Sequence, residues 1–180
     1  WLMTDDAHGI GVVGEGRGSS FITGTKAHVP LQMGTLSKAI GSYGGYLCAS
    51  KPVCDFIRTR ARTLIYSTGL APAQVAAAIA ALDVIEGDAD YANLPVKKAQ
   101  SFTRALNIAP ATSPIVPLIL GDADATLRAS ALLEAEGFLV TAIRPPTVPA
   151  GTARLRFTFT ARHADADIAR LATLVRDKIL

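Results

Sequence analysis

Cysteine is scarce in this sequence. Its 180 residues include only two, Cys48 and Cys54. Neither has companions at zinc-site spacing, and the three histidines, His8, His28 and His163, are far apart along the chain. The sequence therefore gives no indication of a zinc site. So few cysteines favour a reducing compartment, and we expect a cytoplasmic location.

Long hydrophobic runs are also absent. The longest apolar stretch, residues 70–85, is interrupted by Gln74 and Asp83 and is shorter than a membrane span. We also find no signal-peptide pattern at the beginning of the chain. We therefore expect neither a transmembrane helix nor a membrane partner.

A large excess of charge of one sign is also absent. The chain has 18 basic and 15 acidic residues, a net charge of +3. Basic residues are dense only at residues 58–62 and at Lys97-Lys98, so nucleic-acid binding is not expected. With 49% hydrophobic residues, the composition is that of a globular protein with enough chain for one domain or parts of two. The first residue is Trp1 rather than an initiator methionine, so we expect a part of the protein to be missing upstream.

The pattern of apolar and turn residues predicts two parts. Residues 1–95 resemble the end of a larger α/β domain, and residues 96–180 a small α+β domain. The helix expected at 71–85 is apolar almost all round and should be buried, and Pro95 should kink or break the helix expected at 90–106. The other expected elements are strands at 1–4, 28–33, 45–50, 114–120, 138–143 and 154–160, and helices at 51–60, 124–136 and 163–180.

Lys38 is the first candidate for chemistry. It follows Thr35 in a segment rich in glycine, including Gly34 and Gly41, where the backbone can approach a ligand closely. A lysine amine with a lowered pKa is a nucleophile and binds carbonyl compounds such as pyridoxal phosphate (PLP). The alternative is an ordinary solvated lysine at the start of a helix.

Asp5 and His8 are the second candidates, because they stand where a strand runs into a glycine-rich loop, a common place for ligands in α/β proteins. A carboxylate there can hold the N–H of a heteroaromatic ring, and the imidazole can contact the same ring. The same residues could also form part of a metal site or a helix cap. The hydroxyls of Thr35, Ser67 and Thr68 could bind phosphate, although such residues are also common in turns.

Arginine side chains flank a proline-rich loop at residues 144–151. A planar guanidinium binds a carboxylate through two hydrogen bonds, so Arg144 and Arg156 are candidate substrate contacts. Arg154 and Arg156 lie on one face of the expected strand, and the sequence does not decide which of them would point at a ligand.

Four segments, in this order, resemble the α-oxoamine synthase family. They are Asp5-Asp-Ala-His-Gly-Ile-Gly, Gly34-Thr-Leu-Ser-Lys38, Leu64-Ile-Tyr-Ser-Thr68 and Arg144-Pro-Pro-Thr-Val-Pro-Ala-Gly-Thr-Ala-Arg-Leu-Arg156. The last segment is most similar to the alanine-using, biotin-pathway branch. The resemblance implies an α/β protein of PLP fold type I, like aspartate aminotransferase. This chain would then be the C-terminal part, formed by the end of the PLP-binding large domain and a small α+β domain.

The resemblance also implies roles for individual residues. Lys38 would bind PLP covalently, Asp5 would pair with the pyridinium nitrogen, and His8 would contact the phenolic oxygen of the ring. Hydroxyls would contact phosphate, Thr35 within the subunit and Ser67 and Thr68 at the cofactor of a second subunit of a homodimer. The substrate contacts would be Arg156 at the amino-acid carboxylate, together with Thr147 and Arg144.

The implied reaction condenses L-alanine with a pimeloyl thioester, carried by CoA or by a carrier protein, with loss of CO2. Three alternatives stay open. The protein could be a sister enzyme that uses glycine and another acyl-CoA, the 180 residues could be an inactive fragment, or the chain could be a binding module without catalysis. PLP binding and product analysis would distinguish them.

Overall fold

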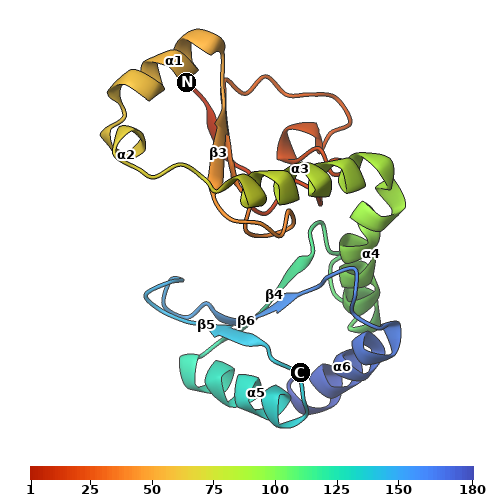
Figure 1. Ribbon diagram of the computed structural model, residues 1–180. Coiled ribbons are helices and arrows are strands. Elements are labelled where there is room, and N and C mark those ends of the chain that lie inside the picture. Colours follow the sequence, from red (N-terminus) through yellow and green to blue (C-terminus); the bar gives the residue numbers. More distant parts are fainter. The chain divides into compact units, whose positions relative to one another are not determined.

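The computed structural model describes residues 1–180 (Figure 1). It consists of two compact units, residues 1–93 and residues 94–180. Each unit contains its own three-stranded sheet. Helix α4, Ala89–Ala105, runs through the boundary and keeps Pro95 inside it, so of the two outcomes expected for this proline a break does not occur.

The sheet of the first unit brings two strand ends to one edge. Its strands are β1 (Met3–Asp5), β2 (Leu31–Thr35) and β3 (Gly45–Cys48), in the order β1-β2-β3. β1 and β2 are parallel, with Asp5 opposite Met33, and β3 runs antiparallel to β2. Because parallel strands end at the same edge of a sheet, Asp5 and Thr35 lie at one edge. β2 starts three residues later than the strand expected at 28–33.

The helices of the first unit follow β3. Helix α1, Lys51–Arg60, has the predicted bounds, and Pro52 lies in its first turn, where the missing N–H has no helical partner to lose. A short helix that the sequence did not indicate, α2 (Arg62–Ile65), comes next. Helix α3 spans Pro72–Gly87, and a 3₁₀ turn at Ser19–Phe21 completes the unit.

The prediction that the helix at 71–85 is buried is wrong. In α3 only Ala78 is buried, while Ile79 is 55% exposed and Val84 51%. A helix that is apolar all round is buried only if neighbours cover every side. Within these 180 residues the glycine-rich loop packs on one side, where Ile85 lies against Gly11 and Gly16, and most other positions of the helix have no cover.

The second unit packs helices on one face of an antiparallel sheet. The strands are β4 (Ile115–Gly121), β5 (Thr141–Ile143) and β6 (Ala153–Thr158), in the order β4-β6-β5. The other helices of this unit are α5 (Ala123–Ala135) and α6 (Asp165–Lys178). The core forms where α4, α5 and α6 meet the sheet. Its most deeply buried large side chains include Phe102, Leu133, Leu155, Phe157 and Val175.

Local signals explain why α5 begins and ends where it does. Asp122 precedes the helix, and its Oδ1 accepts a hydrogen bond of 2.7 Å from the N–H of Ala125, which satisfies one of the free donors at a helix start. After the helix, Gly137 adopts a φ of 88°, a left-handed conformation that glycine enters without strain. The sequence predicts this helix to within one residue at each end.

None of the helices is both long enough and apolar enough to cross a membrane.

Candidate functional site

The glycine-rich loop after β1 presents two of the predicted residues to solvent. Asp5 and His8 are exposed, whereas Asp6 and Ala7 between them are buried. The N–H of Ala7 donates to Oδ1 of Asp5 at 3.0 Å, which fixes the direction of that carboxylate. The loop is closed by a bridge between Ile10 and Arg17. Asp5 and His8 are thus held on one short turn at the end of the strand.

Lys38 and Thr35 lie at the end of β2. Nζ of Lys38 donates to Oγ1 of Thr35 at 3.0 Å, so the side chain folds back over the end of the strand. The intervening turn is closed by backbone hydrogen bonds from Leu36 to Gly44 (2.9 Å) and from Ser42 to Leu36 (2.7 Å). Because β1 and β2 are parallel, the edge that carries Asp5 also carries Thr35 and the turn that holds Lys38.

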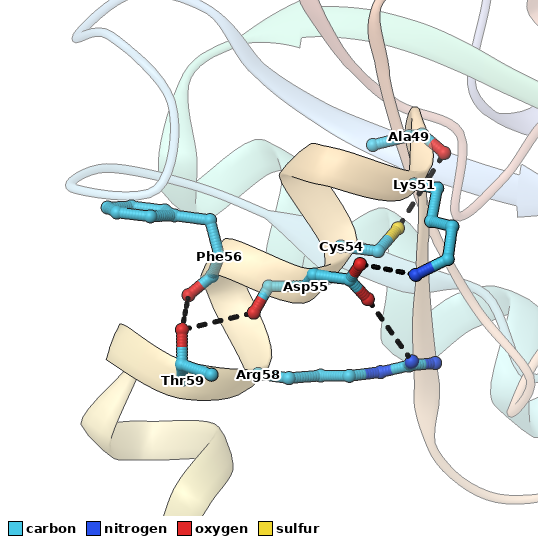
Figure 2. Close-up of polar contacts among 7 residues, drawn as sticks. All are labelled: Ala49, Lys51, Cys54, Asp55, Phe56, Arg58 and Thr59. Atoms are coloured by element: carbon cyan, nitrogen blue, oxygen red, sulfur yellow. Dashed lines mark hydrogen bonds and ion pairs between the residues drawn. The ribbon is translucent and has the colours of Figure 1, made fainter.

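A second lysine of the same unit shows a contrasting environment (Figure 2). On α1, Nζ of Lys51 lies 2.5 Å from Oδ2 of Asp55, and Arg58 approaches Oδ1 of the same carboxylate at 3.8 Å. The hydroxyl of Thr59 donates to the carbonyls of Asp55 and Phe56. Ion pairs between residues three or four apart, such as those of Asp55, stabilise a helix. The ion pair with Asp55 gives Lys51 an ordinary structural role.

Tyr46 on β3 packs over the segment that leads to Lys38, a contact the sequence did not indicate. A Cβ at Gly34 would lie 2.4 Å from the Tyr46 hydroxyl, so a side chain at this position would displace the Tyr46 ring. Burial, the negative charge of Asp6 and that of Cys48 raise the pKa of the Tyr46 hydroxyl above its ordinary value. The only sign of this contact in the sequence is that the strand expected at 45–50 contains an aromatic residue. That this residue lies opposite a glycine is visible only in the folded sheet.

Ser67 and Thr68 line a hollow of about 510 Å³ together with Tyr43, Gly69, Leu70, Ala71 and Gln74. Two contacts hold this segment against the turn that carries Lys38. The hydroxyl of Ser42 donates to the carbonyl of Gln74 at 2.7 Å, and a Cβ at Gly44 would lie 2.7 Å from a methyl group of Leu70. These contacts join the residues that follow the segment with Lys38 to the residues that follow the segment with Ser67 and Thr68.

The three predicted substrate residues are in the second unit. Arg144 and Thr147 are exposed on the proline-rich loop, where the N–H of Thr147 donates to the carbonyl of Arg144. On β6, Arg154 and Arg156 lie on the face opposite the buried Leu155. Arg154 is half-buried and donates from Nε to the carbonyl of Thr152 at 2.9 Å. Arg156 is exposed and its side chain makes no hydrogen bond or ion pair, so its guanidinium is the more available of the two.

A comparison with known protein families identifies the family of the chain. Residues 1–175 match the model of the aminotransferase class I and II family, and the chain belongs to this family. This confirms the family and fold predicted from the four segments.

Within the family, the chain is similar to 8-amino-7-oxononanoate synthases. It is 78% identical to a putative 8-amino-7-oxononanoate synthase of Parvibaculum lavamentivorans over 100% of the chain and 46% of that protein. It is 62% identical to the 8-amino-7-oxononanoate synthase of Beijerinckia indica over 97% of the chain and 45% of that protein. The chain thus spans about half the length of these relatives.

Solved structures show the same fold. The serine palmitoyltransferase of Sphingomonas wittichii matches with a TM-score of 0.87 at 27% identity, covering 97% of the chain and 46% of that protein. The 8-amino-7-oxononanoate synthase of Francisella tularensis matches with a TM-score of 0.82 at 25% identity, covering 98% and 54%. A serine palmitoyltransferase variant with PLP matches with a TM-score of 0.89 at 26% identity, covering 97% and 46%.

The residues of the first unit fit the chemistry of PLP. The carboxylate of Asp5 suits a pyridinium N–H, the hydroxyl of Thr35 suits a phosphate, and the amine of Lys38 suits an aldehyde. The exposure of Asp5, His8 and Lys38 leaves these side chains accessible to a ligand. Each of the three is held by a backbone turn, and these turns lie at the same edge of the sheet.

Proposed function

We propose that this chain carries the cofactor-binding lysine of a PLP-dependent 8-amino-7-oxononanoate synthase. The enzyme condenses L-alanine with pimeloyl-CoA or a pimeloyl carrier protein, releases CO2 and the free thiol of CoA or of the carrier, and makes a precursor of biotin. The observation that carries this proposal is the contact between Lys38 and Thr35 at the sheet edge where β1 ends in Asp5. The 78% identity to the P. lavamentivorans protein supports the choice of substrates.

Bound PLP supplies an electron sink for the negative charge that develops on the α-carbon of the amino acid. The Asp5 carboxylate keeps a proton on the ring nitrogen, and Ala7 holds that carboxylate in place. His8 binds the phenolic oxygen of the ring, and Thr35 binds the phosphate. Nζ of Lys38 would hold the cofactor through its aldehyde carbon and, once the amine of alanine has taken its place there, would accept the α-proton as a general base.

The remaining predicted residues complete the assignment. Ser67 and Thr68 bind the phosphate of the cofactor held by a second subunit, so the active form is a homodimer. Arg156 binds the carboxylate of alanine through two hydrogen bonds and turns the α-proton toward the base, a positioning effect. Thr147 and Arg144 contact the substrate from the loop before β6. The two cysteines are free, in keeping with a cytoplasmic enzyme.

Product analysis tests the proposed substrates. The experiment uses the completed protein, which we define as this chain joined to the part of the P. lavamentivorans relative that lies outside the matched region. Given PLP and a pimeloyl thioester, it is expected to form 8-amino-7-oxononanoate from alanine and to use glycine poorly. Preferential use of glycine would favour a sister enzyme.

The 180 residues alone are expected to be inactive, and turnover by them would exclude the fragment alternative.

Replacing Arg156 by lysine is expected to lower kcat/KM for alanine by about 10-fold to 100-fold, mostly through a higher KM. Lysine keeps the charge and one hydrogen bond to the carboxylate but loses the second, which is worth about 1.5–3 kcal/mol to a charged group. Steady-state kinetics with alanine as the varied substrate measure this. The matched control is Arg154→Lys, because Arg154 is already bonded to the Thr152 carbonyl. A larger loss in the Arg154 variant would contradict the assignment.

A further inference from the structure

Asp6 is the only charged residue among the buried residues of the chain. Its side chain is in the interior, with the residue 8% exposed. It stands next to Asp5 in sequence but points the opposite way, because successive residues at the end of a strand face opposite sides. The exposed carboxylate is assigned to the cofactor, and the proposed function gives the buried one no role.

The carboxylate of Asp6 holds the far end of the glycine-rich loop. The N–H of Ser19 lies 3.1 Å from Oδ1 and 3.1 Å from Oδ2. This bond joins residues 13 positions apart, so it closes the loop that carries His8. Hydrogen bonds to a charged acceptor are about twice as strong as neutral ones.

Two glycines make room for this carboxylate. A Cβ at Gly9 would lie 1.8 Å from Oδ1 of Asp6, and a Cβ at Gly18 would lie 2.0 Å from Oδ2. No real side chain tolerates such distances, so both positions require glycine while Asp6 keeps its place. The φ of Gly18 is 96°, which favours glycine for a second reason. Gly9 has no such constraint, so the carboxylate alone explains it.

The backbone of Asp6 links the same loop to the sheet. Its N–H donates to the carbonyl of Met33 on β2 at 2.8 Å, and its carbonyl accepts from Gly9 at 3.0 Å and Ile10 at 3.1 Å. Movement of Asp6 would therefore move Asp5, which precedes it, and His8, which follows two residues later in the same turn. The same residue fixes the loop to the strand that ends at Thr35.

We propose that Asp6 is a positioning residue: its buried carboxylate, clamped between Gly9 and Gly18 and bonded to Ser19, fixes the loop so that Asp5 and His8 meet the cofactor ring. This inference rests on the proposed function. It gives a role to a residue that does not touch the ring. It also explains why two positions of the loop are glycine. A role limited to folding would change stability but not the properties of bound PLP.

The test compares Asp6→Asn with a matched control in the completed protein. The control is Glu15→Gln, which removes one negative charge from the same loop and breaks an exposed pair with Arg17. Before PLP is added, hydrogen exchange of the Ser19 amide is expected to rise about 10-fold in Asp6→Asn and to stay unchanged in the control. With PLP bound, the pH at which its absorbance changes is expected to shift only in Asp6→Asn. There kcat is expected to fall by about 10-fold to 100-fold, with little change in KM.

A second variant covers the case in which Asp6→Asn does not fold. Gly9→Ala keeps the charge and pushes the carboxylate out of place, so it should raise the same exchange rate and shift the same absorbance. Unchanged exchange at Ser19 in both variants would overturn the inference, and so would raised exchange with unaltered PLP absorbance and kcat. If the unsubstituted protein shows no PLP absorbance, the proposed function fails and this inference fails with it.

Discussion

Replacement of Lys38 by alanine is expected to abolish the absorbance band of lysine-bound PLP and to lower turnover of the completed protein by about 10³-fold or more. The variant loses the amine that binds the cofactor covalently and the base that removes the α-proton, and general-base catalysis alone contributes about 10²-fold to 10⁴-fold. Absorbance spectra before and after borohydride treatment, together with turnover of alanine, measure both effects.

The matched control for Lys38 is Lys51→Ala. Both lysines are exposed in the first unit, but Lys51 is bonded to Asp55 within α1 (Figure 2). Exposed pairs at this spacing contribute about 0.3–0.5 kcal/mol, so this variant should keep its absorbance and turnover. A Lys38→Ala variant with full turnover would exclude the proposed function.

Replacement of Phe102 by alanine is expected to lower the free energy of unfolding of the second unit by about 3–5 kcal/mol. Phe102 is 0% exposed, and its ring centroid lies 4.7 Å from that of Phe157 and 5.2 Å from that of Phe159. Removing such a ring loses both its transfer free energy and its packing contacts. Because domains are stable by only about 5–15 kcal/mol, much of the stability of the unit would be lost. Denaturant unfolding of the chain measures the change.

An exposed leucine of the same unit supplies the control. Leu139 is 89% exposed, and Leu139→Ala is expected to change the free energy of unfolding by less than about 0.5 kcal/mol. A loss below about 1 kcal/mol in Phe102→Ala would contradict the packing described for this core. The core also bears on function, because Leu155 and Phe157 anchor the strand that presents Arg156 on its opposite face.

Elements with strong local signals could be predicted from the sequence. Pro52 marks the start of α1, Asp122 and Gly137 bracket α5, and alternation on β6 separates the buried Leu155 from Arg156. The four family-like segments also carry local signals, because each contains residue types that its proposed chemistry or its turn requires. These segments therefore identified the family. The proposed roles of the individual site residues stay predictions.

Features that depend on distant neighbours could not be predicted. The burial of α3 depends on what packs around it, and an apolar pattern does not report whether those neighbours exist in the chain. The role of Asp6 depends on Ser19, Gly9 and Gly18 meeting around one carboxylate, which needs the folded loop. The hydrogen bond from Arg154 to the Thr152 carbonyl has no sequence signal, and it favours Arg156 as the proposed carboxylate contact.

The central claim is that Lys38 is the residue that binds PLP. The most direct test is borohydride reduction of the PLP-loaded completed protein, followed by digestion and mass spectrometry of the peptides. We predict that the peptide containing Lys38 carries the reduced cofactor. Label on Lys26 or Lys51 with Lys38 unmodified, or no label on any lysine, would contradict it.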